Sequence, residues 1–264
     1  MKQNLFVRHL FISPTDILTF NAYFCFQIQK LILKKLKEMI LEKLEDAHKF
    51  KLWKKNLEDN GLKINKVDEH YTRRRYNGEV LFSLLMLDAE TPEGDKIPPI
   101  CFLKGEVVCV LICLINKETR EKFLLLVKQR RIAEGGFTYE HPAGMVDGTK
   151  TPLEIAIQEV REETGLEISE SQIIDLSPQK RVFPSTGTSD EAIYLFASEI
   201  EMTGEEIAAM NNKEMGTDYE FERITTHVVP FVEGHRLINN TNALLLDYMY
   251  LTKVGDFETL KVLS

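Results

Sequence analysis

Short apolar runs separated by polar connectors are the main pattern of the chain, and they predict β-strands. Two of them, at 78–87 (GEVLFSLLML) and 105–115 (GEVVCVLICLI), open with Gly and are rich in Val, Ile and Leu. The second run is almost wholly apolar, which predicts a strand buried on both faces. The run at 123–131 follows a short polar connector and predicts its hairpin partner. Two further strands are expected at 193–200 and 224–231.

The period of an amphipathic helix appears near both ends of the chain. Between residues 28 and 55, apolar side chains return on one face, namely Leu33, Leu36, Ile40, Leu44 and Ala47. We expect this helix to pack on its own domain, with a membrane surface or calmodulin as the alternative partner. Residues 240–251 predict a closing helix with Asn240 or Thr241 as its N-cap. Mixed strands with a few helices predict an α+β fold or an α/β/α sandwich.

The stretch at 151–165 (TPLEIAIQEVREETG) carries the start and stop signals of a helix. Thr151 and Glu154 form the pattern of a capping box, with Pro152 at the first helical position. Gly165 is placed to end the helix. At about 100° per residue, one side of this helix is apolar and should face the core. The core-facing residues are Leu153, Ala156, Ile157, Val160 and Thr164.

Three carboxylates gather on another side of the same helix. Glu159, Glu162 and Glu163 fall within a single arc of about 100°, where like charges repel one another. A hard cation such as Mg²⁺ prefers oxygen ligands, would offset the repulsion, and could bridge the carboxylates to phosphate oxygens. The alternative is a solvated acidic face that binds nothing.

Composition narrows the classes of protein. The 264 residues are 44% hydrophobic and 28% charged, which is typical of a soluble globular chain. A net charge of -8 argues against a broad nucleic-acid-binding face, so no nucleic-acid partner is expected. No apolar run approaches the roughly 20 residues that a transmembrane helix needs. The N-terminus is faintly like an organelle presequence but lacks its Arg and Ser enrichment, so a cytoplasmic location is expected, with a mitochondrion or other organelle as the alternative.

The four cysteines show no sign of a disulfide framework. Cys25, Cys101, Cys109 and Cys113 contain no CxxC pair and no metal-finger spacing. Cys109 and Cys113 share one face if their run is a strand. We therefore expect buried free thiols in a reducing compartment, rather than a disulfide or a site.

The acidic helix and the loop before it resemble the Nudix hydrolase family. The box of that family is G-x5-E-x7-R-E-U-x-E-E-x-G-U, in which U is apolar. Seven positions match in register: Gly144, Glu159, Val160, Glu162, Glu163, Gly165 and Leu166. Lys150 and Gln158 depart from the box, since the family has Glu and Arg there as orienting residues. Losing both removes an ion pair together and leaves no unpaired charge.

The flanks of the box resemble the ADP-ribose and ADP-sugar pyrophosphatases of that family. Their pattern E-Q-x-R … E-x-P-A-G is matched by Gln129, Arg131, Glu140, Pro142, Ala143 and Gly144. Residues 183–196 are similar to the Pro-containing loop of this branch, with Pro184 in place, and residues 220–231 to the segment that carries its catalytic carboxylate. Residues 50–62 and 101–114 look most like the plant-type ADP-glucose pyrophosphatases.

The resemblance implies an architecture and an assembly. It implies an α/β/α sandwich with a mixed β-sheet, an N-terminal helical extension and an N-terminal strand subdomain. The expected boundaries are 1–48 for the extension, 49–104 for the strands and 105–264 for the hydrolase domain. Relatives in this branch are homodimers that exchange N-terminal strands, so residues 62–87 are expected to form a homodimer interface.

The resemblance also implies an activity. That activity is Mg²⁺-dependent hydrolysis, with Mn²⁺ as a substitute, of a nucleotide sugar such as ADP-glucose or ADP-ribose to AMP and a sugar 1-phosphate. Glu222 is the first candidate for the base that takes the proton of the attacking water, and Glu220 is the second. The implied metal ligands are Glu159, Glu163 and the Ala143 carbonyl, with Glu162 assisting.

Residues around these groups have implied or open roles. Arg131 would hold a phosphate oxygen, because its planar fork suits bidentate contact, or it is only a solvated member of a basic cluster. Glu220 and Glu222 could equally face solvent on the approach to a strand. His141 is expected to be a loop residue and His227 a structural one. The implied substrate-binding residues are Arg131, Glu140, Gly144 and Pro184.

A different class of function is the alternative. A binding or structural subunit would keep the fold and have little or no hydrolase activity. Lys150 and Gln158 favour this alternative, because they replace residues of the box. The three retained glutamates argue against it.

Overall fold

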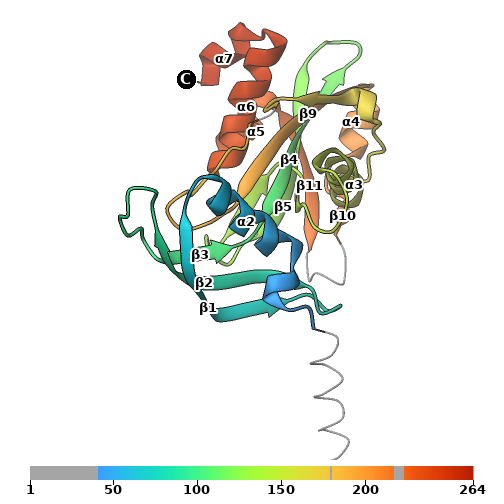
Figure 1. Ribbon diagram of the computed structural model, residues 1–264. Coiled ribbons are helices and arrows are strands. Elements are labelled where there is room, and N and C mark those ends of the chain that lie inside the picture. The colour runs from blue at the N-terminus through green and yellow to red at the C-terminus, as the bar shows by residue number, and fades with distance from the viewer. Residues whose placement is uncertain (1–40, 179, 217–222, 264) are drawn as a thin grey trace, which may run out of the picture.

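The structure, a computed structural model, describes residues 41–178, 180–216 and 223–263 (Figure 1). Its helices are η1 (Leu44–Asp46), α2 (His48–Asp59), α3 (Pro152–Thr164), η2 (Glu170–Gln172), α4 (Gly204–Ala209), α5 (Phe231–Leu237), α6 (Thr241–Val254) and α7 (Phe257–Leu263), where η marks a 3₁₀ helix. Its strands are β1 (Lys63–Arg74), β2 (Val80–Glu90), β3 (Ile100–Leu103), β4 (Glu106–Asn116), β5 (Lys122–Arg130), β6 (Phe137–Glu140), β7 (Ala143–Met145), β8 (Ile173–Asp175), β9 (Ala192–Met202), β10 (Glu214–Met215) and β11 (Ile224–Pro230).

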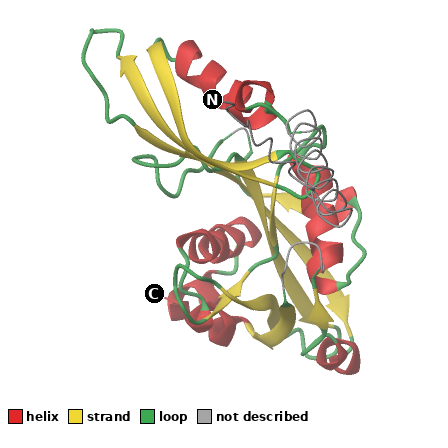
Figure 2. Cartoon of the chain, turned by 90° about the horizontal axis from the view of Figure 1, so that it is seen from below, coloured by secondary structure: helices red, strands yellow, loops and turns green. Residues whose placement is uncertain are grey.

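One mixed sheet organises most of the described chain. Its strand order is β10-β11-β5-β4-β9-β8, with β6 paired to β5 and β7 paired to β4. β4 and β9 run parallel, whereas β4 and β5 form the predicted antiparallel hairpin, with Ile112 opposite Leu125. Helices α3 and α4 cover one face and α5 and α6 the other (Figures 1 and 2). The predicted α/β/α sandwich with a mixed sheet is therefore confirmed.

β4 supplies the core of both layers, because its side chains alternate between the two faces. Every residue from 107 to 115 is buried, as the apolar run predicted. The set that packs with α5 and α6 is Val107, Cys109, Leu111, Cys113 and Ile115. The set that packs with α3 and α4 is Val108, Val110, Ile112 and Leu114.

A second, antiparallel sheet has the order β1-β2-β3 and precedes the sandwich in the chain. β1 is largely polar and exposed, so its strand pattern is weak in the sequence. The apolar residues of β2 and β3 pack against η1 and α2. Their shared core consists of Leu44, Ala47, Phe50, Trp53, Val80, Leu85, Cys101 and Leu103.

The helix predicted across residues 28–55 is wrong over 41–47, where the chain makes a single 3₁₀ turn before α2 begins. Glu42 explains the break, because it pairs with the β1–β2 hairpin. Its N–H donates to the Gly78 carbonyl at 3.2 Å, and its carboxylate accepts the Val80 N–H at 2.8 Å. These bonds hold the backbone outside a helix. The earlier part of this prediction lies outside the described residues.

A buried lysine joins α2 to the sandwich. Lys49 is 8% exposed, and its Nζ donates to the carbonyls of Leu81 at 2.9 Å and Lys104 at 3.1 Å. It also pairs at 3.1 Å with Asp147, which Arg75 contacts at 2.8 Å. Burial lowers the pKa of Lys49, and Asp147 partly opposes this. Since Asp147 lies in the loop that leads into α3, the N-terminal elements hold the approach to that helix.

The cysteines in the described ranges are free, buried thiols, as predicted: Cys101, Cys109 and Cys113. Burial raises the pKa of the Cys101 thiol to about 12, so it is inert at neutral pH. Cys25 lies outside the described residues. None of the helices in the described part of the chain has the length and apolar character needed to cross a membrane.

Candidate active site

Helix α3 begins and ends where the sequence predicts. The Thr151 Oγ1 accepts the Glu154 N–H at 3.3 Å, and the Glu154 carboxylate accepts the Thr151 N–H at 2.7 Å, which completes the capping box. Gly165 ends the helix with a φ of 73°, a left-handed conformation that glycine adopts without strain. Of the predicted core face, Leu153 and Ile157 are only half-buried, while Ile155, which was not predicted, is buried.

Gly144 lets Glu159 lie directly against the backbone of β7. A Cβ built on Gly144 would lie 2.0 Å from the Glu159 Oε1, which no real side chain tolerates. Gly144 is therefore needed for this close approach, and it carries no positive φ. The structure thus brings together two matched positions of the predicted box, Gly144 from its loop and Glu159 from its helix.

Glu163 reaches the neighbouring residue of the same strand. Its Oε2 accepts the Ala143 N–H at 3.1 Å, and the residue is only 6% exposed. The sequence placed Glu163 on a polar arc, but the structure turns it under β7, because the backbone N–H supplies a partner for the buried carboxylate. Ala143, Gly144, Glu159 and Glu163 therefore form one contiguous group at the end of the sheet.

The two positions that depart from the family box are bonded to each other. The Lys150 Nζ donates to the Gln158 Oε1, and the Gln158 Nε2 donates to the Glu162 Oε1 at 3.1 Å. A hydrogen bond thus joins the positions where the family pattern has an ion pair. The bond from Gln158 orients the half-exposed Glu162 beside the other two glutamates.

Arg131, just after β5, and Glu140, at the end of β6, form a bidentate ion pair. The Arg131 Nε and Nη2 donate to the two Glu140 oxygens at 3.0 and 2.9 Å, and the Thr138 hydroxyl donates at 2.5 Å. Burial would raise the pKa of the Glu140 carboxyl, but the bonds from Arg131 and Thr138 outweigh it and hold the pKa below its usual range. Glu140 remains charged and fixes the plane of the Arg131 guanidinium.

Pro184 lies exposed on a loop that is tied to the start of the sandwich. The Asp190 carboxylate accepts the N–H groups of Lys104 at 2.7 Å and Gly105 at 3.1 Å, and Glu191 pairs with the Lys104 Nζ at 2.6 Å. Burial raises the pKa of Asp190, against the effect of those two backbone bonds. The loop is anchored, while the substrate role of Pro184 stays a prediction.

Two predicted residues, Glu220 and Glu222, lie outside the described residues, and their catalytic roles stay predictions. Within the described ranges, no three His, Cys, Asp or Glu side chains converge on a point that could hold a metal ion. Glu159, Glu162 and Glu163 therefore do not form such a cluster in this structure, and their roles as metal ligands, together with the Ala143 carbonyl, stay predictions.

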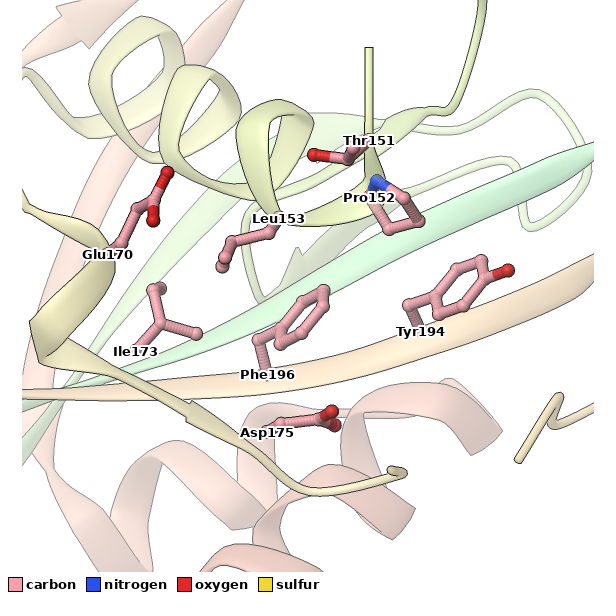
Figure 3. Close-up of a pocket in the computed structure, with 8 residues that line it drawn as sticks. All are labelled: Thr151, Pro152, Leu153, Glu170, Ile173, Asp175, Tyr194 and Phe196. Atoms are coloured by element: carbon pink, nitrogen blue, oxygen red, sulfur yellow. The ribbon is translucent and has the colours of Figure 1, made fainter. Parts of the chain in front are cut away.

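A hollow of about 320 Å³ lies elsewhere on α3, at its N-terminal end (Figure 3). It is mostly apolar, and none of the predicted site residues lines it. Its lining residues are Thr151, Pro152, Leu153, Glu170, Ile173, Asp175, Tyr194 and Phe196.

Sequence reasoning missed a buried polar network next to the site. His141 does lie in the loop between β6 and β7, but it is only 1% exposed, and its Nε2 bonds the Asp247 Oδ1 at 2.8 Å. The Nδ1 of His235 bonds the other Asp247 oxygen at 2.7 Å. The signal in the sequence was a lone Asp in the apolar stretch 243–251. His227 lies in β11, packed 4.9 Å from the Tyr139 ring.

Comparisons with known proteins bear on the family and the fold of this chain. A family profile described as NUDIX domain matches residues 105–230. The protein named Nudix hydrolase 14, chloroplastic, from Arabidopsis thaliana is 30% identical over 223 residues, which are 78% of this chain and 70% of that protein. A solved structure described as "Crystal structure of ADP compounds hydrolase" has a TM-score of 0.51 and 14% identity, and the match covers 74% of this chain and 96% of that one.

The structural likeness shows the fold alone, because the identity is low. The relative from Arabidopsis is similar enough, over enough of both chains, to show the family. The chain therefore belongs to the Nudix hydrolase family and is an enzyme of that hydrolase class.

Proposed function

We propose that the enzyme hydrolyses the diphosphate of an ADP-sugar, such as ADP-glucose or ADP-ribose, in a Mg²⁺-dependent reaction that releases AMP and a sugar phosphate (glucose 1-phosphate from ADP-glucose). The observation that carries the proposal is the junction of β7 with α3. There, Glu159 lies against Gly144 and Glu163 bonds Ala143. The structural neighbour is named as a hydrolase of ADP compounds, which supports the substrate class.

The residues at this junction suit a hard divalent cation. The proposed ligands are the Ala143 carbonyl and the carboxylates of Glu159 and Glu163, with Glu162 assisting, and all of them offer oxygen. The contact at Gly144, which any Cβ would fill, leaves room for the Glu159 carboxylate at the strand. When bound, Mg²⁺ or Mn²⁺ would neutralise charge on the diphosphate.

The remaining steps belong to side chains of this enzyme. Glu140 engages the Nε and Nη2 of Arg131 and fixes the plane of the guanidinium, and the proposed donor to a phosphate oxygen is its Nη1 side. Glu222, or Glu220 as the second candidate, takes the proton of the water that attacks phosphorus. Such a transfer depends on positioning and on charge stabilisation more than on covalent chemistry. The proposed division of roles follows that requirement.

The proposed assembly is a homodimer that uses the sheet of β1, β2 and β3. The support is that aromatic and aliphatic side chains of this sheet are exposed, namely Tyr71 at 61%, Ile100 at 43% and Phe102 at 40%. Exposed strand edges favour pairing with another chain. A monomeric mass by light scattering at micromolar concentration would contradict this proposal.

For the compartment, the cytoplasm is the first prediction and an organelle the alternative. The name of the Arabidopsis relative places that protein in the chloroplast, which supports the alternative. Microscopy of the full chain carrying a C-terminal fluorescent protein, with and without residues 1–40, distinguishes the two. Organelle fluorescence that depends on those residues would favour the alternative.

The test of the activity is release of the nucleoside monophosphate, AMP from ADP-glucose, ADP-ribose and NADH and UMP from UDP-glucose, each with Mg²⁺ and with EDTA. We expect metal-dependent AMP from at least one ADP-sugar, and the relative rates rank the sugars. Folded protein that binds Mn²⁺ but releases no nucleotide from any substrate would overturn the proposal and support the binding-subunit alternative.

A further inference from the structure

The network of His141, Asp247 and His235 crosses from one layer of the sandwich to the site. Asp247 lies on α6, His235 on α5, and His141 in the loop between β6 and β7. The side chains of Asp247 and His141 are 0% exposed, and that of His235 is 9% exposed. Each imidazole occupies a different oxygen of the same carboxylate.

His141 stands between two parts of the site in the chain. Glu140, on one side, holds Arg131 in its bidentate pair. Ala143, two residues further, donates its N–H to Glu163. Any rotation of the backbone at His141 would move both Glu140 and the Ala143 carbonyl. A side chain fixed at this point therefore fixes the geometry of the whole segment.

Stability alone does not account for this network. A carboxylate with no solvent exposure is costly even when it is paired, and well-packed apolar residues at such places often stabilise a fold more. In addition, the Nδ1 of His141 is buried and has no hydrogen-bond partner among the residues that the structure describes. Buried polar atoms without partners are rare and call for an explanation. A requirement on the orientation of the loop supplies one.

The network is also close to the site carboxylates. Cys109, which pairs with Ala143 in the sheet, is near both the site carboxylates and Asp247. Burial raises the pKa of the Cys109 thiol, and the charges of Glu140, Glu163 and Asp247 raise it further. The charges of the site carboxylates and of Asp247 therefore act on the same buried thiol, Cys109.

We infer that His141 is a positioning residue, held by Asp247, that fixes the Glu140–Ala143 segment so that Arg131 and the Ala143 carbonyl face the metal and the diphosphate. The inference rests on the proposed function. Within the part of the chain that the structure describes, His235 bonds Asp247 from the other side and packs against Tyr248, neither of which belongs to the site.

Two matched pairs of variants separate positioning from stability. His141→Leu and His235→Leu each remove one bond to the same carboxylate. His141→Gln keeps a donor near the Nε2 position, and His235→Asn keeps one near the Nδ1 position. For each variant the readouts are the Mn²⁺ dissociation constant by electron paramagnetic resonance, the Tm, and kcat and KM for the best ADP-sugar.

We expect His141→Leu to weaken Mn²⁺ binding and to lower kcat by about 10-fold or more, as the loss of partners behind metal ligands does elsewhere. His141→Gln should recover both to within about threefold. His235→Leu should lower the Tm yet leave the Mn²⁺ constant within about threefold of the parent. If both leucine variants changed Tm and Mn²⁺ affinity in parallel, the network would be merely structural and the inference wrong.

Asp247→Asn and hydrogen exchange keep the test decisive if His141→Leu does not fold. Asparagine matches aspartate in shape, so this variant weakens both imidazole bonds with little change in packing. Exchange of the peptide spanning residues 140–146 should be faster in Asp247→Asn than in the parent, and unchanged exchange would contradict the inference. A parent protein that releases no AMP from any ADP-sugar would defeat the proposed function, whereas this exchange result does not depend on turnover.

Discussion

The two faces of the central sheet hold charge in opposite ways. On the face covered by α3, Glu159 and Glu162 lie half-exposed on the last two turns of the helix, while Glu163 is buried against β7. On the face covered by α6, Asp247 is completely buried and has an imidazole on each oxygen. A single strand, β4, supplies the apolar core of both faces.

The exposure of a carboxylate determines whether it can bind a cation from solution or only a partner within the fold. Half-exposed carboxylates keep contact with water, so leaving them without a cationic partner from the protein costs little free energy. Such carboxylates can bind a cation from solution. A fully buried carboxylate needs partners supplied by the fold, since an unpaired charge in the interior is strongly unfavourable. The α3 face is therefore suited to binding, and the α6 face to fixing geometry.

Asp247→Ala should produce the largest effect, because it disrupts the buried network on the α6 face of the sheet. It leaves two buried imidazoles without their acceptor and removes a fully enclosed side chain. We expect a loss of about 3–5 kcal/mol in the free energy of unfolding, measured by urea denaturation. Lys253→Ala, at an exposed position of the same helix, is the control. A loss below about 1 kcal/mol would mean that the network contributes little.

Glu159→Gln and Glu163→Gln test the other face and should affect catalysis instead. Each substitution keeps the shape and removes a charged oxygen from the proposed metal site. We expect kcat to fall about 100-fold or more, equivalent to about 2.7 kcal/mol of barrier, in an assay of AMP release. Glu167→Gln, exposed just beyond the same helix, should keep the parent rate. Parent activity in both site variants would rule out this site.

Gly144→Ala probes the contact that joins strand to helix. The new Cβ would occupy the position of the Glu159 carboxylate, so that carboxylate must move. We expect a drop of about tenfold in kcat, about 1.4 kcal/mol, together with weaker Mg²⁺ activation. The control is Gly204→Ala, whose Cβ would meet only the Asn116 amide at 3.3 Å. Equal activity in the two variants would show that catalysis does not require the Glu159 carboxylate to lie against Gly144.

The double variant Lys150→Glu with Gln158→Arg should have the smallest effect. It replaces the present hydrogen bond by the ion pair of the family pattern, near the surface. Such pairs contribute about 0–1 kcal/mol, so kcat should stay within about threefold of the parent. Gln158→Arg alone should be worse, because it sets two cations side by side. A large gain in rate from the double variant would show that these departures limit the enzyme.

The sequence predicted the elements that depend on local pattern. The buried run of β4, its hairpin partner and the caps of α3 are set by residues close together in the chain, and all are confirmed. The family motif put Gly144 and Glu159 in register, but their contact was not predicted and came from the structure.

Features that depend on distant partners could not be predicted. The bond between His141 and Asp247 joins residues 106 apart in the sequence. The predicted N-terminal helix breaks because Glu42 pairs with a hairpin more than 30 residues later. The sequence placed Glu163 on a polar arc away from the core face, whereas the structure buries it against the Ala143 N–H. In each case, a hydrogen bond made only in the folded chain outweighs the local periodicity.

The most direct test of the account is Mn²⁺ binding to the folded parent and to Glu163→Gln, followed by electron paramagnetic resonance in the absence of substrate. We expect the parent to bind Mn²⁺ and Glu163→Gln to bind it about tenfold more weakly or worse, at an unchanged Tm. Equal binding by the two proteins would contradict the claim that α3 and the 143–144 strand hold the catalytic metal.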